Sequence, residues 1–191
     1  MTKLYHLGKG VVEGIELIPD YQKRIQLVSP FIKALDKDID VFENMLNEAR
    51  YLKEVLRRSK LREWSNCCKW ATEAVFEYIR KNEFGDRYSR MRCNYYYDTI
   101  EKCKRLYKKD YLDSGDDEGN ELFEVHVEDE HPQYFDMAIY DEAYEKMEAE
   151  EGIEEIMDTA RRYWNLERNS NEIVEVLSDK KAVIFRRISW D

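Results

Sequence analysis

The sequence has few of the residues that interrupt regular structure, with only 7 Gly and 3 Pro among 191 residues. This scarcity excludes collagen-like chains and chains made mainly of flexible linkers. The sequence also lacks any apolar run of the roughly 18 residues that a membrane-spanning helix needs, so we expect no contact with a membrane. Residues 1–6 lack the apolar core of a signal peptide, and a cytoplasmic protein is therefore expected.

Potential metal ligands are also scarce. The four cysteines, none of them in a CxxC pair, are Cys67, Cys68, Cys93 and Cys103. The three histidines are His6, His126 and His131. Because zinc sites need closely spaced Cys and His ligands, we predict no metal site and interpret the cysteines as free thiols in a reducing compartment.

The common nucleotide-binding and hydrolase motifs are absent. No GxxxxGK[ST] segment is present, which excludes a P-loop, and no GxSxG segment indicates a serine hydrolase. Gly8, Gly10 and Gly14 depart from the dinucleotide-binding GxGxxG pattern, since the third glycine comes one position late. The residues that follow, 15–19, do not begin a helix, and a Rossmann site is therefore excluded.

Charge is abundant and unevenly distributed. The chain carries 31 Lys and Arg against 41 Asp and Glu, a formal net charge of −10. Residues 50–109 contain 17 basic and 8 acidic side chains, a net of +9, whereas residues 113–158 contain 19 acidic and one basic, a net of −18. The basic segment favours an anionic ligand, and the acidic segment favours a basic partner or a solvated surface.

The spacing of apolar residues predicts an α+β fold with a mostly antiparallel sheet. We expect one domain over residues 1–191, with a helical insertion at about 28–83 after the first strand and an acidic helical stretch at about 141–165, interrupted at Gly152. The predicted helices are 31–56, 64–80 and 99–109. The predicted strands are 3–7, 91–97, 122–128, 134–140, 173–177 and 182–188.

Five short segments resemble a known superfamily when they are taken in order. They are Tyr5-His6-Leu7, Phe76-Glu77-x-Ile79-Arg80, Ser89-Arg90, Ala160-x-x-Tyr163-Trp164 and Glu175-Val176-Leu177. This order resembles the ADP-ribosyltransferase-like superfamily of the His-Tyr-Glu type, and within it a family of small bacterial proteins. The resemblance implies a split antiparallel β-sheet core and NAD as substrate, without a metal.

The resemblance also implies roles for individual residues. His6 would bind the ribose of NAD beside Tyr5, and Arg90 would hold the pyrophosphate. Tyr96 and Tyr107 would sandwich the nicotinamide ring. Glu175 would be the catalytic carboxylate, acting with His6 and Tyr107, and Glu172 is a less favoured alternative.

The chemistry of NAD cleavage agrees with a glutamate at this place. Breaking the bond between nicotinamide and ribose builds positive charge on the ribose, which a nearby carboxylate stabilises. In the predicted strand, Glu175 shares a face with the apolar Ile173 and Leu177. An acidic side chain among apolar neighbours indicates a cleft rather than an open surface.

The resulting hypothesis is an NAD-dependent mono-ADP-ribosyltransferase that modifies an intracellular macromolecule. Nucleic acid, as RNA or single-stranded DNA, is favoured over protein because arginines and tyrosines can contact phosphates and bases. The arginines considered are Arg57, Arg58, Arg62, Arg80, Arg87 and Arg92. The resemblance implies a toxin of a toxin–antitoxin or phage-defence system, with the acidic segment bound by a neutralising antitoxin protein. The alternatives are a protein target, an NAD glycohydrolase, and a non-enzymatic interaction or inhibitor protein on a degenerate transferase fold.

Overall fold

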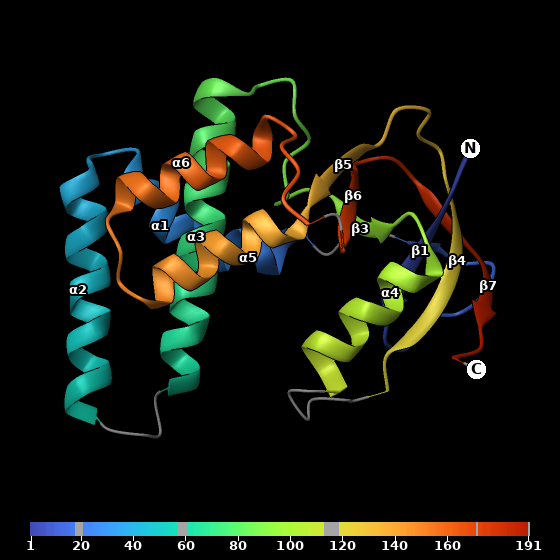
Figure 1. The fold of residues 1–191 in the computed structure, drawn as a ribbon, viewed down its shortest axis with the longest axis horizontal. Coiled ribbons are helices and arrows are strands. Elements are labelled where there is room, and N and C mark those ends of the chain that lie inside the picture. The colour runs from blue at the N-terminus through green and yellow to red at the C-terminus, as the bar shows by residue number, and fades with distance from the viewer. Residues whose placement is uncertain (18–20, 57–60, 113–118, 171, 191) are drawn as a thin grey trace. The chain divides into compact units, whose positions relative to one another are not determined.

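The structure, a computed structural model, describes residues 1–17, 21–56, 61–112, 119–170 and 172–190, without the side chains of residues 21, 52–56, 61–63 and 110. The chain forms two compact units (Figure 1). The sheet unit comprises Met1–Pro19, Arg92–Ala138 and Leu166–Asp191, and the helical unit comprises Asp20–Met91 and Ile139–Asn165. The chain therefore passes between the units four times, and neither unit is one continuous segment.

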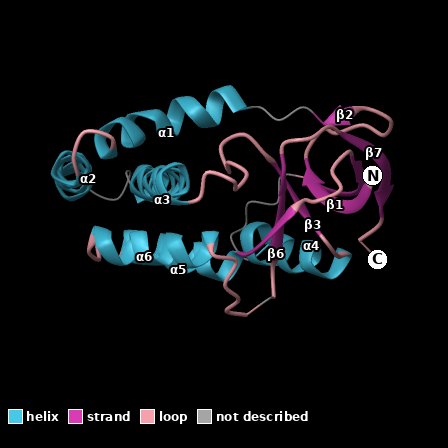
Figure 2. Ribbon diagram, turned by 90° about the horizontal axis from the view of Figure 1, so that it is seen from above, coloured by secondary structure: helices cyan, strands magenta, loops and turns pink. Residues whose placement is uncertain are grey.

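The helical unit is built around α3. Its helices are α1 (Tyr21–Leu35), α2 (Ile39–Leu56), α3 (Leu61–Glu83), α5 (Met137–Glu148, from Ile139 on) and α6 (Ile153–Trp164). Figure 2 shows α3 between α1 on one side and α6 on the other, and both helices contact it. The core of the helical unit contains large buried side chains from four helices, such as Phe31, Phe42, Phe76, Met157 and Trp164. No helix within the described ranges is both long and apolar enough to cross a membrane.

The predicted single helix over residues 31–56 is wrong, because the chain turns between α1 and α2. The backbone N–H groups of Lys37 and Asp38 both donate to the carbonyl oxygen of Ala34, at 3.1 and 3.0 Å, which ends α1. The Asp38 carboxylate then accepts from the N–H of Asp40 at 2.9 Å and caps α2. The helix also begins earlier than predicted, with Pro30 inside α1.

The sheet unit contains a seven-stranded antiparallel sheet, so the predicted α+β class with an antiparallel sheet is confirmed. Its strands are β1 (Thr2–Gly8), β2 (Glu16–Leu17), β3 (Asn94–Tyr97), β4 (Glu121–Val127), β5 (Gln133–Asp136), β6 (Val174–Ser178) and β7 (Ala182–Ile188). They lie in the order β2-β7-β4-β1-β3-β6-β5. The strand predicted over 134–140 ends at Asp136, whose carboxylate accepts from the N–H of Ala138 at 3.1 Å where α5 begins.

The two faces of the sheet have separate apolar clusters. The first face carries a cluster that includes Leu4, Tyr96, Phe123, Val125 and Val176. The second face carries Tyr97, Leu122 and Ile173, which pack with Cys103 and Leu106 of α4 (Ile100–Tyr107). Figure 1 shows α4 beside the strands, and the helix contacts β1 and β3. Thr99 caps α4, since its hydroxyl accepts from the N–H of Lys102 at 3.3 Å.

A buried ion pair holds the helical unit together at Arg90. Its guanidinium donates to both carboxylate oxygens of Glu73 at 3.0 Å and to the hydroxyl of Tyr163 at 2.8 Å. It also lies 4.1 Å above the centre of the Tyr140 ring. Burial alone would raise the pKa of the Glu73 carboxyl, but the charge and hydrogen bonds of Arg90 outweigh burial and lower this pKa.

A neighbouring pair extends this network. Arg80 donates to both oxygens of Glu77 at 2.9 and 2.8 Å, and the hydroxyl of Ser89 donates to Glu77 at 2.9 Å. Arg80 also donates to the carbonyl oxygen of Arg87 at 3.1 Å. The charged residues on which the superfamily resemblance rests therefore tie the segment after α3 to the helices.

We predict that Glu73→Gln destabilises the protein by about 3–5 kcal/mol at pH 7, because Arg90 keeps its buried charge and loses its counter-ion. Urea unfolding measures this difference. The control is Glu83→Gln, whose carboxylate binds Arg161 at the surface at 3.0 Å and should contribute at most about 1 kcal/mol. Equal effects of the two substitutions would contradict the assigned role.

Folding lowers the pKa of Glu73. The ionised carboxylate therefore stabilises the folded protein above pH 4.5, the ordinary pKa of glutamate, and this stabilisation is lost as the pH falls below that value. Acid unfolding of Glu73→Gln should therefore be less steep below pH 4.5 than that of the wild type.

Candidate functional site

Three neighbouring strands in the middle of the sheet carry most of the predicted site residues. β3 lies between β1 and β6, and their registers place Tyr5 opposite Tyr97 and Tyr97 opposite Glu175. Directly paired residues point to the same face, whereas successive residues of one strand alternate. Tyr5, Tyr97 and Glu175 therefore lie on the second face.

His6 and Tyr96 lie on the first face, next to each other. Their ring centroids are 6.0 Å apart and tilted by 60°. The sheet thus brings His6 together with Tyr96 and separates both from Glu175. The strands do not gather the predicted histidine and glutamate at one site.

The tautomer of His6 follows from one hydrogen bond. Its Nδ1 lies 3.0 Å from the carbonyl oxygen of Tyr95, which can only accept, so Nδ1 carries the proton. Burial lowers the pKa of the imidazole more than this bond raises it. At neutral pH His6 is therefore uncharged, and Nε2 is a hydrogen-bond acceptor.

Gly8 has no side chain, and the imidazole ring of His6 lies close to the place where a Cβ atom of residue 8 would be. A Cβ atom at residue 8 would lie 3.1 Å from Nε2 and 3.2 Å from Cδ2 of His6, and 2.7 Å from Cγ2 of Val11. Side chains two residues apart on a strand point the same way, which explains this close approach. Gly8 and Val11 therefore bound the acceptor nitrogen of His6.

Tyr96 is part of the core and is fully buried. Its hydroxyl accepts from Nδ2 of Asn94 at 3.0 Å, and its ring packs in the first-face cluster. In this position the ring packs beside His6 and is not exposed for stacking on nicotinamide.

Glu175 is also buried, with 1% of its surface exposed. Its cross-strand neighbours are Tyr97 on β3 and Phe135 on β5, both buried. The predicted apolar surroundings of this glutamate are confirmed by its burial, whereas the predicted shared site with His6 is not formed.

Tyr107 lies at the end of α4, the helix that packs on the second face. Its ring stacks on Trp190 with centroids 4.3 Å apart, and Tyr111 follows at 5.8 Å. The structure therefore does not place Tyr107 opposite Tyr96 in a nicotinamide sandwich.

The predicted phosphate-binding arginines have several different positions. Arg90 is buried in the helical unit with Glu73 and Tyr163, so its guanidinium is already engaged. Arg87 donates to the carbonyl oxygen of Trp164 at 3.1 Å, and Arg92 is exposed. The predictions for Arg57 and Arg58 lie outside the described residues, as does that for the side chain of Arg62.

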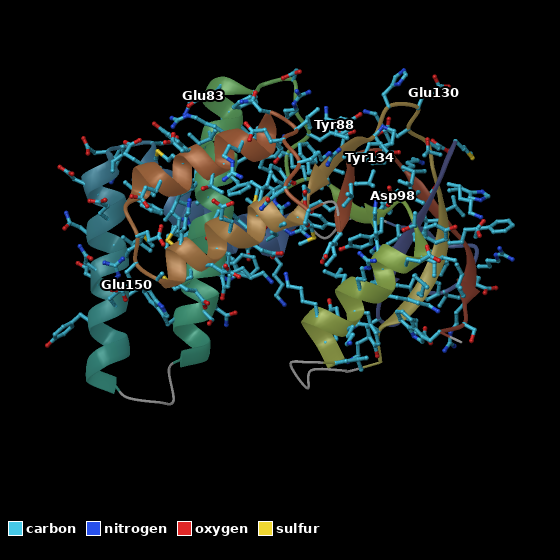
Figure 3. The ribbon with its side chains drawn as sticks, viewed as in Figure 1. Glu83, Tyr88, Asp98, Glu130, Tyr134 and Glu150 are labelled. Atoms are coloured by element: carbon cyan, nitrogen blue, oxygen red, sulfur yellow. The ribbon has the colours of Figure 1, made fainter. Side chains whose placement is uncertain are left out.

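Asp98 is a site candidate that the sequence analysis did not identify. It follows β3 directly, and its Oδ2 accepts from Nζ of Lys102 at 2.8 Å. Its Oδ1 is buried and has no hydrogen-bond partner among the described residues. After burial, Asp98 is the main cause that raises the pKa of Tyr134 on β5 (Figure 3). The Asp98 side chain as a whole is half-buried, and its buried Oδ1 makes this residue a candidate acceptor that no motif in the sequence indicates.

The described part of the chain contains no cluster of three or more His, Cys, Asp or Glu side chains suited to a metal ion. The candidate groups therefore stay apart: His6 with Gly8 lies on the first face, Glu175 lies on the second face, and Asp98 follows the end of β3.

Sequence comparison identifies the family. Residues 23–189 match the model of a family described as "Protein of unknown function (DUF2441)". The chain belongs to the DUF2441 family. No curated protein matches it. The matched range includes Tyr96, Tyr107 and Glu175, whereas β1 with His6 precedes it.

We predict that His6 stays neutral with the proton on Nδ1 when the pH is lowered below 6.5, the ordinary value for histidine. Nitrogen-15 NMR of the imidazole measures both the tautomer and the pKa. Because the folded pKa is lowered, stability should fall as the pH drops below 6.5. A doubly protonated His6 at pH 6.5 would contradict the assignment.

We further predict that Gly8→Ala destabilises the protein by about 1–3 kcal/mol, because the new methyl group overpacks against His6 and Val11. The matched control is Gly85→Ala, where a Cβ atom meets nothing within 4 Å. Thermal unfolding compares the two variants. Equal stability of both would show that the space beside His6 is not tightly filled.

Proposed function

We propose that this DUF2441 protein is an NAD-dependent mono-ADP-ribosyltransferase with an ADP-ribosyltransferase-like arrangement of its antiparallel sheet. One observation carries the proposal. His6, on the opening strand, is neutral and has an acceptor nitrogen at Nε2 beside a glycine. This is the form of histidine that can accept a hydrogen bond from a ribose hydroxyl.

The proposed reaction exchanges one bond to the ribose for another. The bond between the nicotinamide nitrogen and the anomeric carbon breaks, and its electron pair leaves with nicotinamide. An oxygen or nitrogen of the acceptor then bonds to this carbon and loses its proton to a base. A carboxylate stabilises the positive ribose and orients the acceptor.

We consider two carboxylates for this role. Glu175 is the one that the superfamily resemblance assigns, although it lies on the face opposite His6. Asp98 lies two residues beyond Tyr96 and has a buried acceptor oxygen. Substituting each in turn distinguishes them.

We favour RNA or single-stranded DNA as the acceptor over protein. The support is the net charge of +9 in residues 50–109, a segment that also contains seven tyrosines. An enzyme that ADP-ribosylates the nucleic acid of its own cell would be harmful unless a partner inhibits it. This requirement agrees with a toxin of a toxin–antitoxin or phage-defence system. The acidic residues 113–158 would then be the surface that a neutralising protein binds.

A second candidate is a non-enzymatic interaction protein on a degenerate transferase fold. The separation of His6 and Glu175 on opposite faces of the sheet favours it. Such a protein would neither cleave NAD nor transfer any part of it.

We predict that the wild-type protein transfers label from adenylate-labelled NAD to nucleic acid in a bacterial lysate. His6→Ala should lower the rate about tenfold, since one hydrogen bond to the ribose is removed. Removal of the catalytic carboxylate, tested with Glu175→Gln and Asp98→Asn, should lower it by about 10²–10³. Glu83→Gln is the matched control and should keep full activity. Nuclease and protease digestion then identify the acceptor.

Three results would change the proposal. Label released only by protease would assign a protein acceptor. Nicotinamide released without labelling would indicate an NAD glycohydrolase. A folded wild-type protein that neither transfers label nor releases nicotinamide would overturn the enzyme and leave the interaction protein.

A further inference from the structure

An aromatic stack lies at the end of α4, within the sheet unit. Tyr107 is flanked by Trp190 at 4.3 Å, with ring planes 21° apart, and by Tyr111 at 5.8 Å, with ring planes 30° apart. All three side chains are partly exposed. One stacked pair and one tilted pair of rings therefore bring three partly exposed aromatic side chains together at this end of α4.

The wide helical turn after α4 sets this arrangement. Lys108–Leu112 forms a π-helix, η1, which continues α4. Such turns are rare and occur frequently at functional sites. Here the turn places Tyr111 against Tyr107 and leaves Leu112 half exposed.

Basic side chains are frequent in the stretch of helix that leads to the stack, with Asp98, Glu101 and Asp110 on either side of it in the sequence. Residues 102–109 contain five basic side chains and no acidic one. Lys102 is paired with Asp98, and Lys104 donates to the carbonyl oxygen of Trp190 at 2.9 Å, which ties the C-terminal segment to the helix. Arg105 and Lys108 are exposed and three positions apart, so they lie on one side of the helix.

We propose that Tyr107, Tyr111 and Trp190, with Arg105 and Lys108, form a binding surface for single-stranded nucleic acid. Unpaired bases would stack on the aromatic rings while the two cations contact the phosphates. This surface, called the α4 platform, deepens the proposed function, since it would hold the nucleic-acid acceptor. Tyr111 and Trp190 would then stack on bases of the acceptor, and Tyr107 would support these two rings and not bind nicotinamide.

The chemistry of the α4 platform favours this occupant over others. A duplex hides its base faces, so it could use the cations and not the rings. An acidic peptide would likewise match the charges and leave the flat rings unused. Only an unpaired strand uses both features.

Binding is tested directly with the full chain and no NAD. Fluorescence anisotropy of a labelled 12-nucleotide uridine-rich RNA gives Kd at several salt concentrations. Arg105→Ala combined with Lys108→Ala should lower the slope of log Kd against log salt by about 1.4, because each phosphate of a single strand that a cation neutralises adds about 0.7 to the slope. The matched control is Lys33→Ala combined with Lys37→Ala, which removes two exposed charges of the helical unit outside residues 50–109 and should leave the slope unchanged.

The aromatic stack is tested separately. Trp190→Ala should weaken binding about tenfold or more because a base can no longer stack on the indole ring, and Trp190→Phe should retain most of the affinity. If Trp190→Ala fails to fold, the exposed double variant still tests the surface. The Kd of a single-stranded DNA of the corresponding sequence, measured in the same way, shows whether the protein prefers ribose or deoxyribose.

Binding of a duplex as tight as the single strand would overturn the α4 platform, as would wild-type affinity in both platform variants or no binding of either strand. These results are independent of catalysis, because NAD is absent. If the protein binds single strands but transfers no label from NAD, the α4 platform stands and the proposed enzyme activity is wrong. If it transfers label but the platform variants bind as the wild type does, the enzyme activity stands and the platform is wrong.

Discussion

The antiparallel pairing of β3 with β1 and β6 decides on which face of the sheet His6, Tyr96 and Glu175 lie. With Tyr5 opposite Tyr97, His6 and Tyr96 share the first face, and Glu175 falls on the second. A register shift of one residue would exchange the faces, but it would also expose the apolar residues that each face buries. The hydrophobic effect therefore enforces the separation of histidine and glutamate. Any chemistry at His6 has to recruit its carboxylate from a strand end or from the far side of the sheet.

In the helical unit, the need to neutralise a buried charge fixes the position of Arg90. A buried guanidinium needs a counter-ion, and Glu73 supplies it to Arg90 with two hydrogen bonds. The pair fixes the segment between α3 and β3, which leads the chain into the strand that carries Tyr96 and Tyr97. Arg90, which the resemblance assigns to the NAD pyrophosphate, therefore stabilises the fold, whereas the exposed Arg105 and Lys108 lie on α4 and η1.

Local patterns predicted the parts of the fold that depend on local forces. The spacing from Trp64 to Ile79 indicated α3, and the run of β-branched and aromatic residues within 182–188 indicated β7. The break before α2 and the early end of β5 were missed because the carboxylates of Asp38 and Asp136 accept backbone hydrogen bonds that outweigh the apolar pattern there. Within one strand the sequence correctly placed Glu175 among apolar neighbours. Its relation to His6 depends on pairing between strands about 170 residues apart, which alternation within a strand cannot reveal.

The division of the helical unit between two chain segments has a consequence for synthesis on the ribosome. α3 is complete at Glu83, but α6, which covers one of its sides, ends at Trp164. Between the end of the first helical segment at residue 91 and the end of the second at residue 165, translation at about 5–20 residues per second takes about 4–15 seconds. During that interval the apolar side of α3, including Phe76, has no partner from α6. The nascent chain therefore exposes an apolar helix face to water for several seconds, and this makes it a natural substrate for a chaperone that shields hydrophobic segments during translation.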